Sequence, residues 1–159
     1  MWKRALALGT LLALSTAAGA APAATPATAA SPASGYDAAL AASLGADERG
    51  MRQYVLVILK TGPNKMAEGP ARTEMFKGHF ANMSRLAAEK KLVLAGPLDG
   101  KDGRRGIFVL NTSDLEAAKA WVGTDPVVIN GEMAVEFHKF YGSAALMMVN
   151  QVHARIEKK

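Results

Sequence analysis

The residues of this chain that could carry out chemistry are a histidine and an aspartate that lie far apart in the sequence. His79 falls inside the apolar stripe of an expected helix, where a rotation of about 100° per residue places it on the same side as Met75. Asp125 precedes Pro126, a few residues before the last expected strand. Once the chain folds, the carboxylate could fix the tautomer of the imidazole, whose other nitrogen would then move a proton on a small cyclic or carbonyl substrate.

Each of the two residues also has a plain structural explanation. A histidine in a helix stripe is more often a packed side chain that is hydrogen-bonded to a backbone carbonyl. An aspartate before a proline commonly starts a helix, with the aspartate as N-cap and the proline in the first helical position. The functional interpretation therefore depends on His79 and Asp125 meeting at one opening of the sheet, beside Gly96-Pro97 at the end of the second expected strand.

The last expected strand adds candidate residues to this site. We predict that His138 contributes to substrate binding together with Gly96 and Pro97, and that Glu136 and Tyr141 are further candidates. Because side chains alternate along a strand, His138 and Tyr141 lie on opposite faces and cannot both line one site. A histidine at such a position is more often a surface residue.

The elements that must position these residues can be read from hydrophobic periodicity and turn signals. Ser113 and Glu116 form a capping box that starts the second helix, and Gly123 ends it. A short turn or helix follows Pro126. The expected strands cover residues 54–59, 92–95, 106–110 and 132–141, and the expected helices cover residues 72–90 and 113–122.

The order strand, helix, strand, strand, helix, strand predicts an α+β fold, the ferredoxin-like βαββαβ sheet with both helices on one face. The first three strands are apolar on both faces, so the face without helices also needs a cover. We therefore predict a homodimer in which two sheets pack face to face as a dimeric α+β barrel. A C-terminal amphipathic helix, with Leu146, Val149, Val152 and Ile156 on one side, is expected to dock on the domain or on its dimer mate. A membrane-surface helix is the alternative.

The N-terminus has the pattern of an export signal. A basic start is followed by an apolar run and by Ala18-Gly19-Ala20, the small residues that a signal peptidase reads. The alternative is a membrane anchor, but a spanning helix needs about 20 apolar residues, which is longer than this run. We predict a signal peptide (1–20), a flexible linker rich in Ala and Pro (21–50), an α+β domain (51–145) and a helical tail (146–159), in a periplasmic or secreted protein with no stable membrane insertion after cleavage.

Composition excludes several kinds of site. The chain of 159 residues contains no cysteine and only three histidines, which excludes thiolate chemistry and leaves no metal-ligand spacing. The formal net charge of +5 includes Lys3 and Arg4 of the expected signal, and the doublets Lys90-Lys91 and Arg104-Arg105 are interpreted as solvated surface. No basic face with interleaved aromatic residues indicates nucleic-acid binding, and no glycine loop indicates a nucleotide. We expect no cofactor and no metal.

Three motifs, taken in their order along the chain, resemble the YciI-like (YCII-related) domain family. They are His79-Phe80-x-x-Met83, the segment from Leu92 to Leu98 and Asp125-Pro126, and the similarity covers about residues 53–145. The resemblance implies a dimeric α+β barrel with a cleft in which His79 and Asp125 take the positions of the family histidine and aspartate. One branch of the family is similar in fold to enzymes that eliminate chloride from chlorinated aromatic compounds, and muconolactone isomerases share the fold.

The chain departs from the family pattern in two places. Family members often have glycine between the first helix and the second strand, where this chain has Lys90-Lys91, so a different turn is expected there. The export signal and linker also differ from the usual intracellular members.

Three functions agree with these observations. The first is a lyase or isomerase that uses His79 and Asp125 on a small-molecule ligand. The second is a non-catalytic periplasmic domain that binds a ligand in the same cleft. The third is a structural dimer module in which the polar pair is a hydrogen bond of the core.

Overall fold

The structure, a computed structural model, describes residues 35–158. The expected signal peptide and the first part of the expected linker lie outside the described residues. Within them the elements follow in the order α1 (Ala38–Ser43), β1 (Met51–Thr61), α2 (Pro70–Ala88), β2 (Leu92–Pro97), η1 (Lys101–Gly103), β3 (Arg104–Leu110), α3 (Leu115–Val122), α4 (Pro126–Ile129), β4 (Met133–Ser143), η2 (Ala144–Met148) and α5 (Val149–Ile156).

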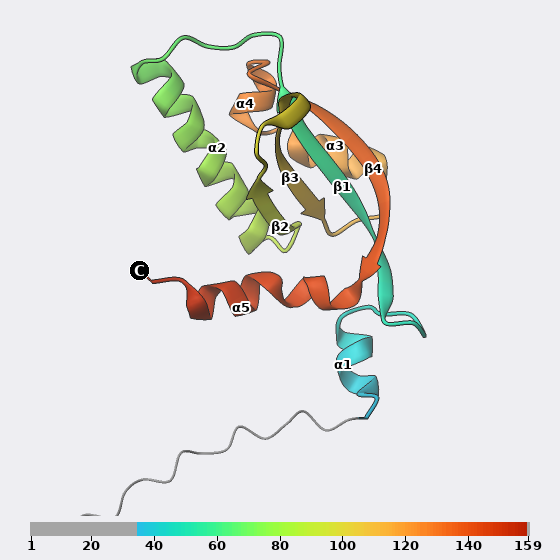
Figure 1. Cartoon of the computed structure of the whole chain (residues 1–159). Coiled ribbons are helices and arrows are strands. Elements are labelled where there is room, and N and C mark those ends of the chain that lie inside the picture. Colours follow the sequence, from blue (N-terminus) through green and yellow to red (C-terminus); the bar gives the residue numbers. More distant parts are fainter. Residues whose placement is uncertain (1–34, 159) are drawn as a thin grey trace, which may run out of the picture. The chain divides into compact units, whose positions relative to one another are not determined.

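The four strands form one antiparallel sheet in the order β2-β3-β1-β4 (Figure 1). The helix α2 connects β1 to β2, and α3 and α4 connect β3 to β4. This βαββαβ connectivity, with β1 and β3 in the middle of the sheet, is the ferredoxin-like arrangement. The α+β fold expected from the sequence is therefore confirmed.

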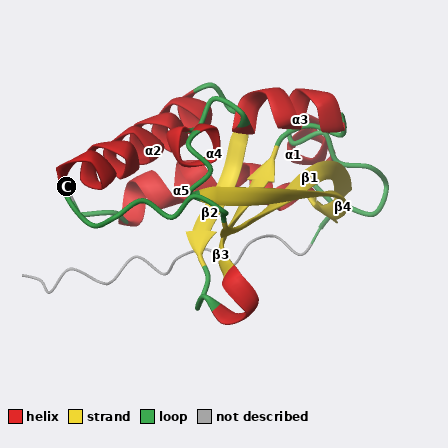
Figure 2. Ribbon diagram, turned by 90° about the horizontal axis from the view of Figure 1, so that it is seen from above, coloured by secondary structure: helices red, strands yellow, loops and turns green. Residues whose placement is uncertain are grey.

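The main hydrophobic core lies between the sheet and the helices α2, α3 and α4 (Figure 2). Val55, Val57 and Leu59 point to this side from the central strand β1, because alternate residues of a strand share a face. They meet Leu86 of α2 and Val122 of α3, which are also almost fully buried. We call this side of the sheet the helix face.

The opposite side of the sheet is partly covered by the C-terminal tail. Leu146 and Met147 of η2 pack against a second cluster that consists of Tyr54, Val93 and Val109. The tail is not one continuous amphipathic helix, since η2 precedes α5 and the last apolar residues, Val152 and Ile156, are exposed. The first residues of the tail therefore dock on the domain, and docking of α5 on a dimer mate stays a prediction.

Residues 36–50 were expected to be linker, and the structure differs there. Asp37 caps the short helix α1 by accepting a hydrogen bond from the backbone N–H of Leu40. The guanidinium of Arg52 then donates to the carbonyl oxygen of Leu44 at 2.7 Å and to Oδ1 of Asn111 at 2.6 Å. The bond from Arg52 of β1 to Leu44 connects this segment to the sheet, and local hydrophobic patterning does not reveal such a contact.

Two local predictions at helix ends are corrected by the structure. The N-cap of α3 is Asp114, not Ser113, because Oδ1 of Asp114 accepts the backbone N–H of Glu116 at 2.8 Å. At the end of α2, Lys90 adopts the left-handed conformation (φ 58°) that glycine would adopt more easily. The backbone N–H of Lys91 closes this turn on the carbonyl oxygen of Leu86, so the turn keeps the geometry of a glycine-terminated helix without the glycine.

Candidate functional site

His79 is positioned by α2, the helix that covers the β2 side of the sheet. The helix turns His79 to the same side as Met75, Asn82 and Leu86, the other buried residues of α2. This agrees with the apolar stripe read from the sequence. The imidazole is nearly buried, and it faces the sheet rather than solvent.

Asp125 lies in the connection between α3 and α4, and its side chain is fully buried. Its Oδ1 accepts the backbone N–H of Val127 at 3.1 Å and so caps α4, with Pro126 in the first helical position. Its Oδ2 lies 2.8 Å from Nδ1 of His79. One carboxylate is therefore both the helix cap and the partner of the histidine, so the two interpretations of Asp125 do not compete.

A close approach of α2 to α4 brings this pair together. Gly78 precedes His79 and faces Pro126, and a Cβ atom added at Gly78 would lie only 3.0 Å from Cγ of that proline. Because such a contact is tighter than most side-chain contacts, the missing side chain allows the two helices to approach. Sequence reasoning missed Gly78, which has no special backbone conformation that would mark it.

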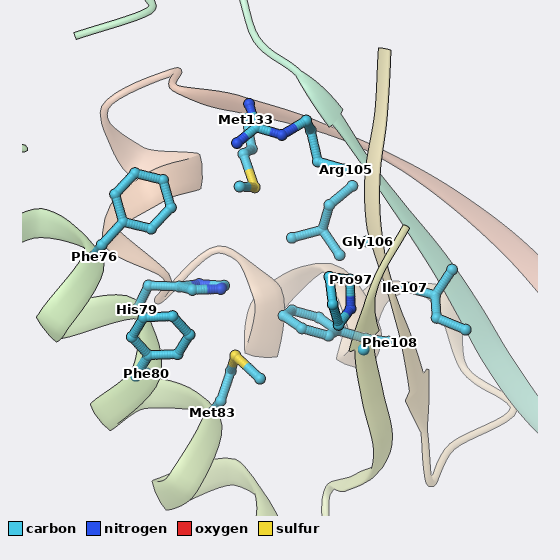
Figure 3. Close-up of a pocket in the computed structure, with 12 residues that line it drawn as sticks. Phe76, His79, Phe80, Met83, Pro97, Arg105, Gly106, Ile107, Phe108 and Met133 are labelled. Carbon is cyan, nitrogen blue, oxygen red and sulfur yellow. The ribbon is translucent and has the colours of Figure 1, made fainter. Parts of the chain in front are cut away.

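His79 lines a cavity of about 290 Å³ between α2 and the ends of β2 and β3 (Figure 3). Most of the wall is apolar or aromatic, and Arg105 is the only lining residue besides His79 that has an ionisable side chain. Phe80 at the rim is 59% exposed, which is unusual for a large aromatic side chain. The lining residues are Leu59, Phe76, His79, Phe80, Met83, Gly96, Pro97, Arg105, Gly106, Ile107, Phe108 and Met133.

Aromatic rings hold the imidazole in place. The ring of His79 stacks on Phe108 with centroids 6.1 Å apart and an angle of 22°, and it contacts Phe80 at 5.3 Å and the edge of Phe76 at 6.1 Å. Because a carboxylate can only accept, Nδ1 donates its proton to Asp125, and in the neutral form of the ring the lone pair is then on Nε2. Within residues 35–158, Nε2 makes no hydrogen bond and is not sealed from solvent.

The structure separates the predicted site residues into three groups. His79, Gly96 and Pro97 line the cavity, and Asp125 lies behind His79 without reaching the cavity wall. His138 is on the other side of the sheet, since it pairs in register with Leu56 of the second cluster, and its side chain is 52% exposed. His138 was expected at the substrate site, but it does not line this cavity.

The other candidates on β4 are also outside the cavity. Glu136 forms an ion pair with Lys60 at 2.6 Å on the side of the sheet that carries His138. Tyr141 donates a hydrogen bond to Asp47 near the far end of β1. Alternation along the strand correctly separated His138 from Tyr141, but neither of them lines the cavity.

Arg105 is a lining residue that sequence reasoning missed, because the doublet Arg104-Arg105 was interpreted as solvated surface. The pairing of β1 with β3 shifts register here: Leu59 pairs with Gly106, and Lys60 pairs with Arg104. Arg105 is the extra residue of this bulge, and a bulge can redirect a side chain. Arg104 forms an exposed pair with Asp102, whereas the Arg105 side chain extends across the cavity toward Met133 (Figure 3).

A second buried carboxylate, Glu132, lies just before β4 beside Met133 of the cavity wall. Its Oε2 accepts the backbone N–H of Met66 at 2.6 Å, and its Oε1 accepts Nη2 of Arg72 at 3.0 Å. These contacts connect the loop between β1 and α2 to the start of β4. Chiefly the hydrogen bond from Met66, and then the guanidinium of Arg72, hold the pKa of Glu132 below its usual value despite burial.

The described part of the chain lacks the features of a metal site and of a membrane-spanning helix. Among residues 35–158, no group of three or more His, Cys, Asp or Glu side chains is placed to hold a metal ion. Nor does that part contain a helix with the length and apolarity needed to cross a membrane. A histidine that is oriented by an aspartate and opens on an apolar cavity can bind a ligand or transfer a proton without a metal ligand set.

Comparison with known proteins identifies a domain family and solved structures of similar fold. The search of curated proteins gave no match. A solved structure that resembles this fold is 5-chloro-2-hydroxyhydroquinone dehydrochlorinase from Burkholderia phenoliruptrix AC1100 in complex with 2,5-dihydroxybenzoquinone. It is 19% identical, with a TM-score of 0.39, and the match covers 54% of this chain and 92% of that chain.

The family comparison covers the elements that build the site. The family model for the YCII-related domain matches residues 53–138, which include α2 with His79, the Gly96-Pro97 end of β2 and Asp125. The match spans more than half of the chain and agrees with the resemblance seen in the sequence motifs. The chain therefore belongs to the YCII-related domain family.

Proposed function

We propose that the domain binds a small molecule in the cavity beside His79 and that His79 transfers a proton on this ligand. One observation carries the proposal: Nδ1 of His79 is bonded to a buried carboxylate at 2.8 Å, while the same ring lines a cavity. A histidine that served only the core would not need an open cavity on its other side. The reaction class that fits is an elimination or an isomerisation by general acid–base catalysis.

In this mechanism Asp125 is a positioning residue and His79 is the catalytic residue. The Nδ1–H bond to Oδ2 keeps the lone pair on Nε2, which takes a proton from the ligand. The imidazolium that forms is stabilised by the same carboxylate, and it returns the proton to another atom of the ligand. Because Oδ1 is held by the backbone N–H of Val127, the carboxylate cannot rotate away during these steps.

The test uses proton exchange on a simple cyclic ketone. We expect the protein to accelerate deuterium incorporation next to the carbonyl of cyclohexanone in D2O, followed by NMR. General acid–base catalysis contributes about 10²- to 10⁴-fold, so His79→Gln is expected to remove an acceleration of up to that size. His138→Gln is the matched control, because His138 lies on the other side of the sheet, and it is expected to leave the rate unchanged.

The alternatives predict different results from the same variants. In a non-catalytic periplasmic binding domain, ligands bind beside His79 but the wild-type protein accelerates no exchange. In a purely structural module, no ligand binds, and His79→Gln and Asp125→Asn only lower the unfolding temperature. A small molecule retained through purification from the native host, detected by native mass spectrometry and lost in His79→Gln, would support binding and contradict the structural alternative.

We also propose that the domain forms a homodimer through the side of the sheet that carries no helix from the βαββαβ unit. Ile58 on this side is half-buried, and the tail residues Leu146 and Met147 cover only the neighbouring cluster of Tyr54, Val93 and Val109. Apolar side chains of this kind gain from a second sheet. Ile58→Lys is expected to convert the dimer to monomers in light scattering, while Val152→Lys on the exposed side of α5 is expected to leave it intact.

Export is the remaining part of the proposal. Its support is the basic, apolar and small-residue pattern of residues 1–20, which lie outside the described residues. The expected outcome is that the protein isolated from the native host begins after Ala20 in N-terminal sequencing and is found in the periplasm or the medium. An intact Met1 in a cytoplasmic fraction would contradict this part.

A further inference from the structure

Arg105 carries a positive charge into the cavity without a partner of its own. Within residues 35–158, its guanidinium forms no hydrogen bond and no ion pair, although the side chain lines the cavity. Its neighbour Arg104 is engaged with Asp102 at 3.2 Å and is half-exposed. Two adjacent arginines are therefore used differently, one in an exposed pair and one at an apolar wall.

The nearby carboxylate does not neutralise Arg105. Glu132 is close enough for the charge of Arg105 to help lower its pKa, but this contribution follows those of Met66 and Arg72. Both oxygens of Glu132 are already occupied, one by the backbone N–H of Met66 and one by Arg72. With Glu132 matched by Arg72, the charge of Arg105 is in excess at this end of the cavity.

A guanidinium beside an apolar wall gains most from an anionic ligand. Transfer from water to a low-dielectric site weakens its solvation, and a planar carboxylate or enolate can restore two hydrogen bonds at once. The rest of the wall matches a planar ring, since Phe76, Phe80 and Phe108 surround His79. Aromatic rings favour stacked or edge contacts with another ring.

The size of the cavity limits the ligand to one ring. An apolar cavity of about 150 Å³ accepts benzene, so the space of 290 Å³ beside His79 holds a single ring with small substituents. A fused or extended ring system would need the exposed rim at Phe80 to open. The charge of Arg105, the aromatic cavity wall and the cavity volume thus all favour a small ligand with one planar ring and a negative charge.

We propose that the ligand is a single-ring planar acid whose anionic oxygens bind Arg105 while its ring lies among Phe76, Phe80 and Phe108, next to His79. This inference rests on the proposed function, because it assigns a ligand class to the same cavity. Arg105 is a binding and specificity-determining residue in it, and His79 keeps its role in proton transfer.

The experiment compares two ligands of the same shape and different charge. Benzoate and benzamide are titrated into the full mature protein, with affinities measured by NMR from the resonances of His79 and the lining methyl groups. We expect benzoate to bind at least tenfold more tightly than benzamide. Cyclohexanecarboxylate, which has the charge but not the planar ring, is expected to bind more weakly than benzoate.

The variants assign the preference to one arginine. Arg105→Met keeps the length of the side chain and is expected to lower benzoate affinity about ten- to hundredfold, the usual loss for a charge-assisted hydrogen bond, with little change for benzamide. Arg104→Met is the matched control, because it changes the net charge equally at an exposed site, and it is expected to change both affinities less than twofold. Arg105→Lys retains the charge, so it is expected to recover part of the benzoate preference even if the methionine variant folds poorly.

The possible failures are distinguishable. Equal affinity for benzoate and benzamide, or an equal loss in Arg104→Met and Arg105→Met, would overturn the assignment of Arg105 but leave ligand binding beside His79 intact. If neither compound shifts the resonances of His79, the planar-acid ligand class is overturned. The proposed function is contradicted only if the wild-type protein also fails to accelerate deuterium exchange on cyclohexanone. Binding of cyclohexanecarboxylate as tight as that of benzoate would overturn the planar-ring requirement alone.

Discussion

Two buried carboxylates at the same end of the domain show how the partner decides what a buried charge can do. Asp125 and Glu132 are both sealed from solvent, and each accepts one backbone N–H and one side-chain donor. The side-chain donor is His79 for Asp125 and Arg72 for Glu132. An imidazole changes its protonation near neutral pH, whereas a guanidinium remains charged.

The position of the donor adds a second difference. His79 extends from its carboxylate to the cavity wall, so its free nitrogen can contact a ligand. Arg72 shares its guanidinium between Glu132 and the exposed Glu68, and it also lies over the ring of Phe76. The Asp125 pair is therefore suited to proton transfer, and the Glu132 pair holds the loop before α2 against the start of β4.

The largest effect is expected from Glu132→Gln. A glutamine has one oxygen for two donors, so either Met66 or Arg72 loses its acceptor inside the protein. Breaking a buried ion pair from one side costs about 3 kcal/mol in the free energy of unfolding, measured by urea denaturation. Glu68→Gln is the control, because this partner of Arg72 is 83% exposed, and it is expected to cost less than about 0.5 kcal/mol. Similar losses of stability in the two variants would show that Glu132 does not hold the loop before α2 against the start of β4.

A smaller loss of stability, with a clear effect on His79, is expected from Asp125→Asn. Asparagine can accept from Val127 or from His79 but not from both, which costs about 2 kcal/mol. Nitrogen NMR is expected to show a change in the tautomer of the imidazole. Asp114→Asn is the matched control: that cap serves only Glu116, and asparagine is an equally good cap. An unchanged His79 tautomer in Asp125→Asn would contradict the positioning role of the carboxylate.

The pH dependence of unfolding tests the Glu132 side of the comparison. The folded-state pKa of Glu132 is lowered, so this residue adds stability above the unfolded-state pKa, near about 4.3, and that stability is lost as the pH falls through the lower folded-state pKa. We expect the free energy of unfolding of the wild-type protein to decrease in this acid range more steeply than that of Glu132→Gln. Parallel curves for the two proteins would contradict the lowered pKa.

The smallest effect is expected from Gly78→Ala, which tests the helix contact behind the Asp125 pair. Helix propensity alone favours alanine by about 1 kcal/mol, but the new Cβ would lie 3.0 Å from the Pro126 ring. The contact is expected to cancel most of this gain and to speed solvent exchange of the Nδ1–H proton of His79. Ala81→Gly, at an exposed position of the same helix, calibrates the propensity difference. If Gly78→Ala gains the full stability expected from helix propensity and the exchange of the Nδ1–H proton is unchanged, Gly78 does not control the contact behind His79.

Much of the fold follows from local patterns in the sequence. The apolar run of β1, the stripe of α2 and the Gly96-Pro97 end of β2 each depend on residues that are neighbours in the chain, and the structure contains all three elements. Strand ends were less well predicted, because residues such as Arg104 and Gly142 extend a strand only through pairing with β1. Local patterning says little about such pairing.

The site was only partly predictable for the same reason. His79 and Asp125 stood out because polar residues interrupt apolar or turn patterns there. His138 was expected beside His79 but lies outside the cavity, since alternation says which side chains share a face but not which face carries the cavity. Arg105 was missed because a one-residue bulge, set by the register with β1, decides its direction.

The amino-acid sequence alone determined the order of the elements, the family motifs and the residues with acid–base chemistry, because each is written in short-range patterns. Only the tertiary structure decided that Gly78 lets α2 approach α4, that one carboxylate caps a helix and orients His79, and that Arg105 rather than His138 lines the cavity. The physical reason is that distance and direction between side chains arise from packing and strand register, which join residues that are far apart in the chain.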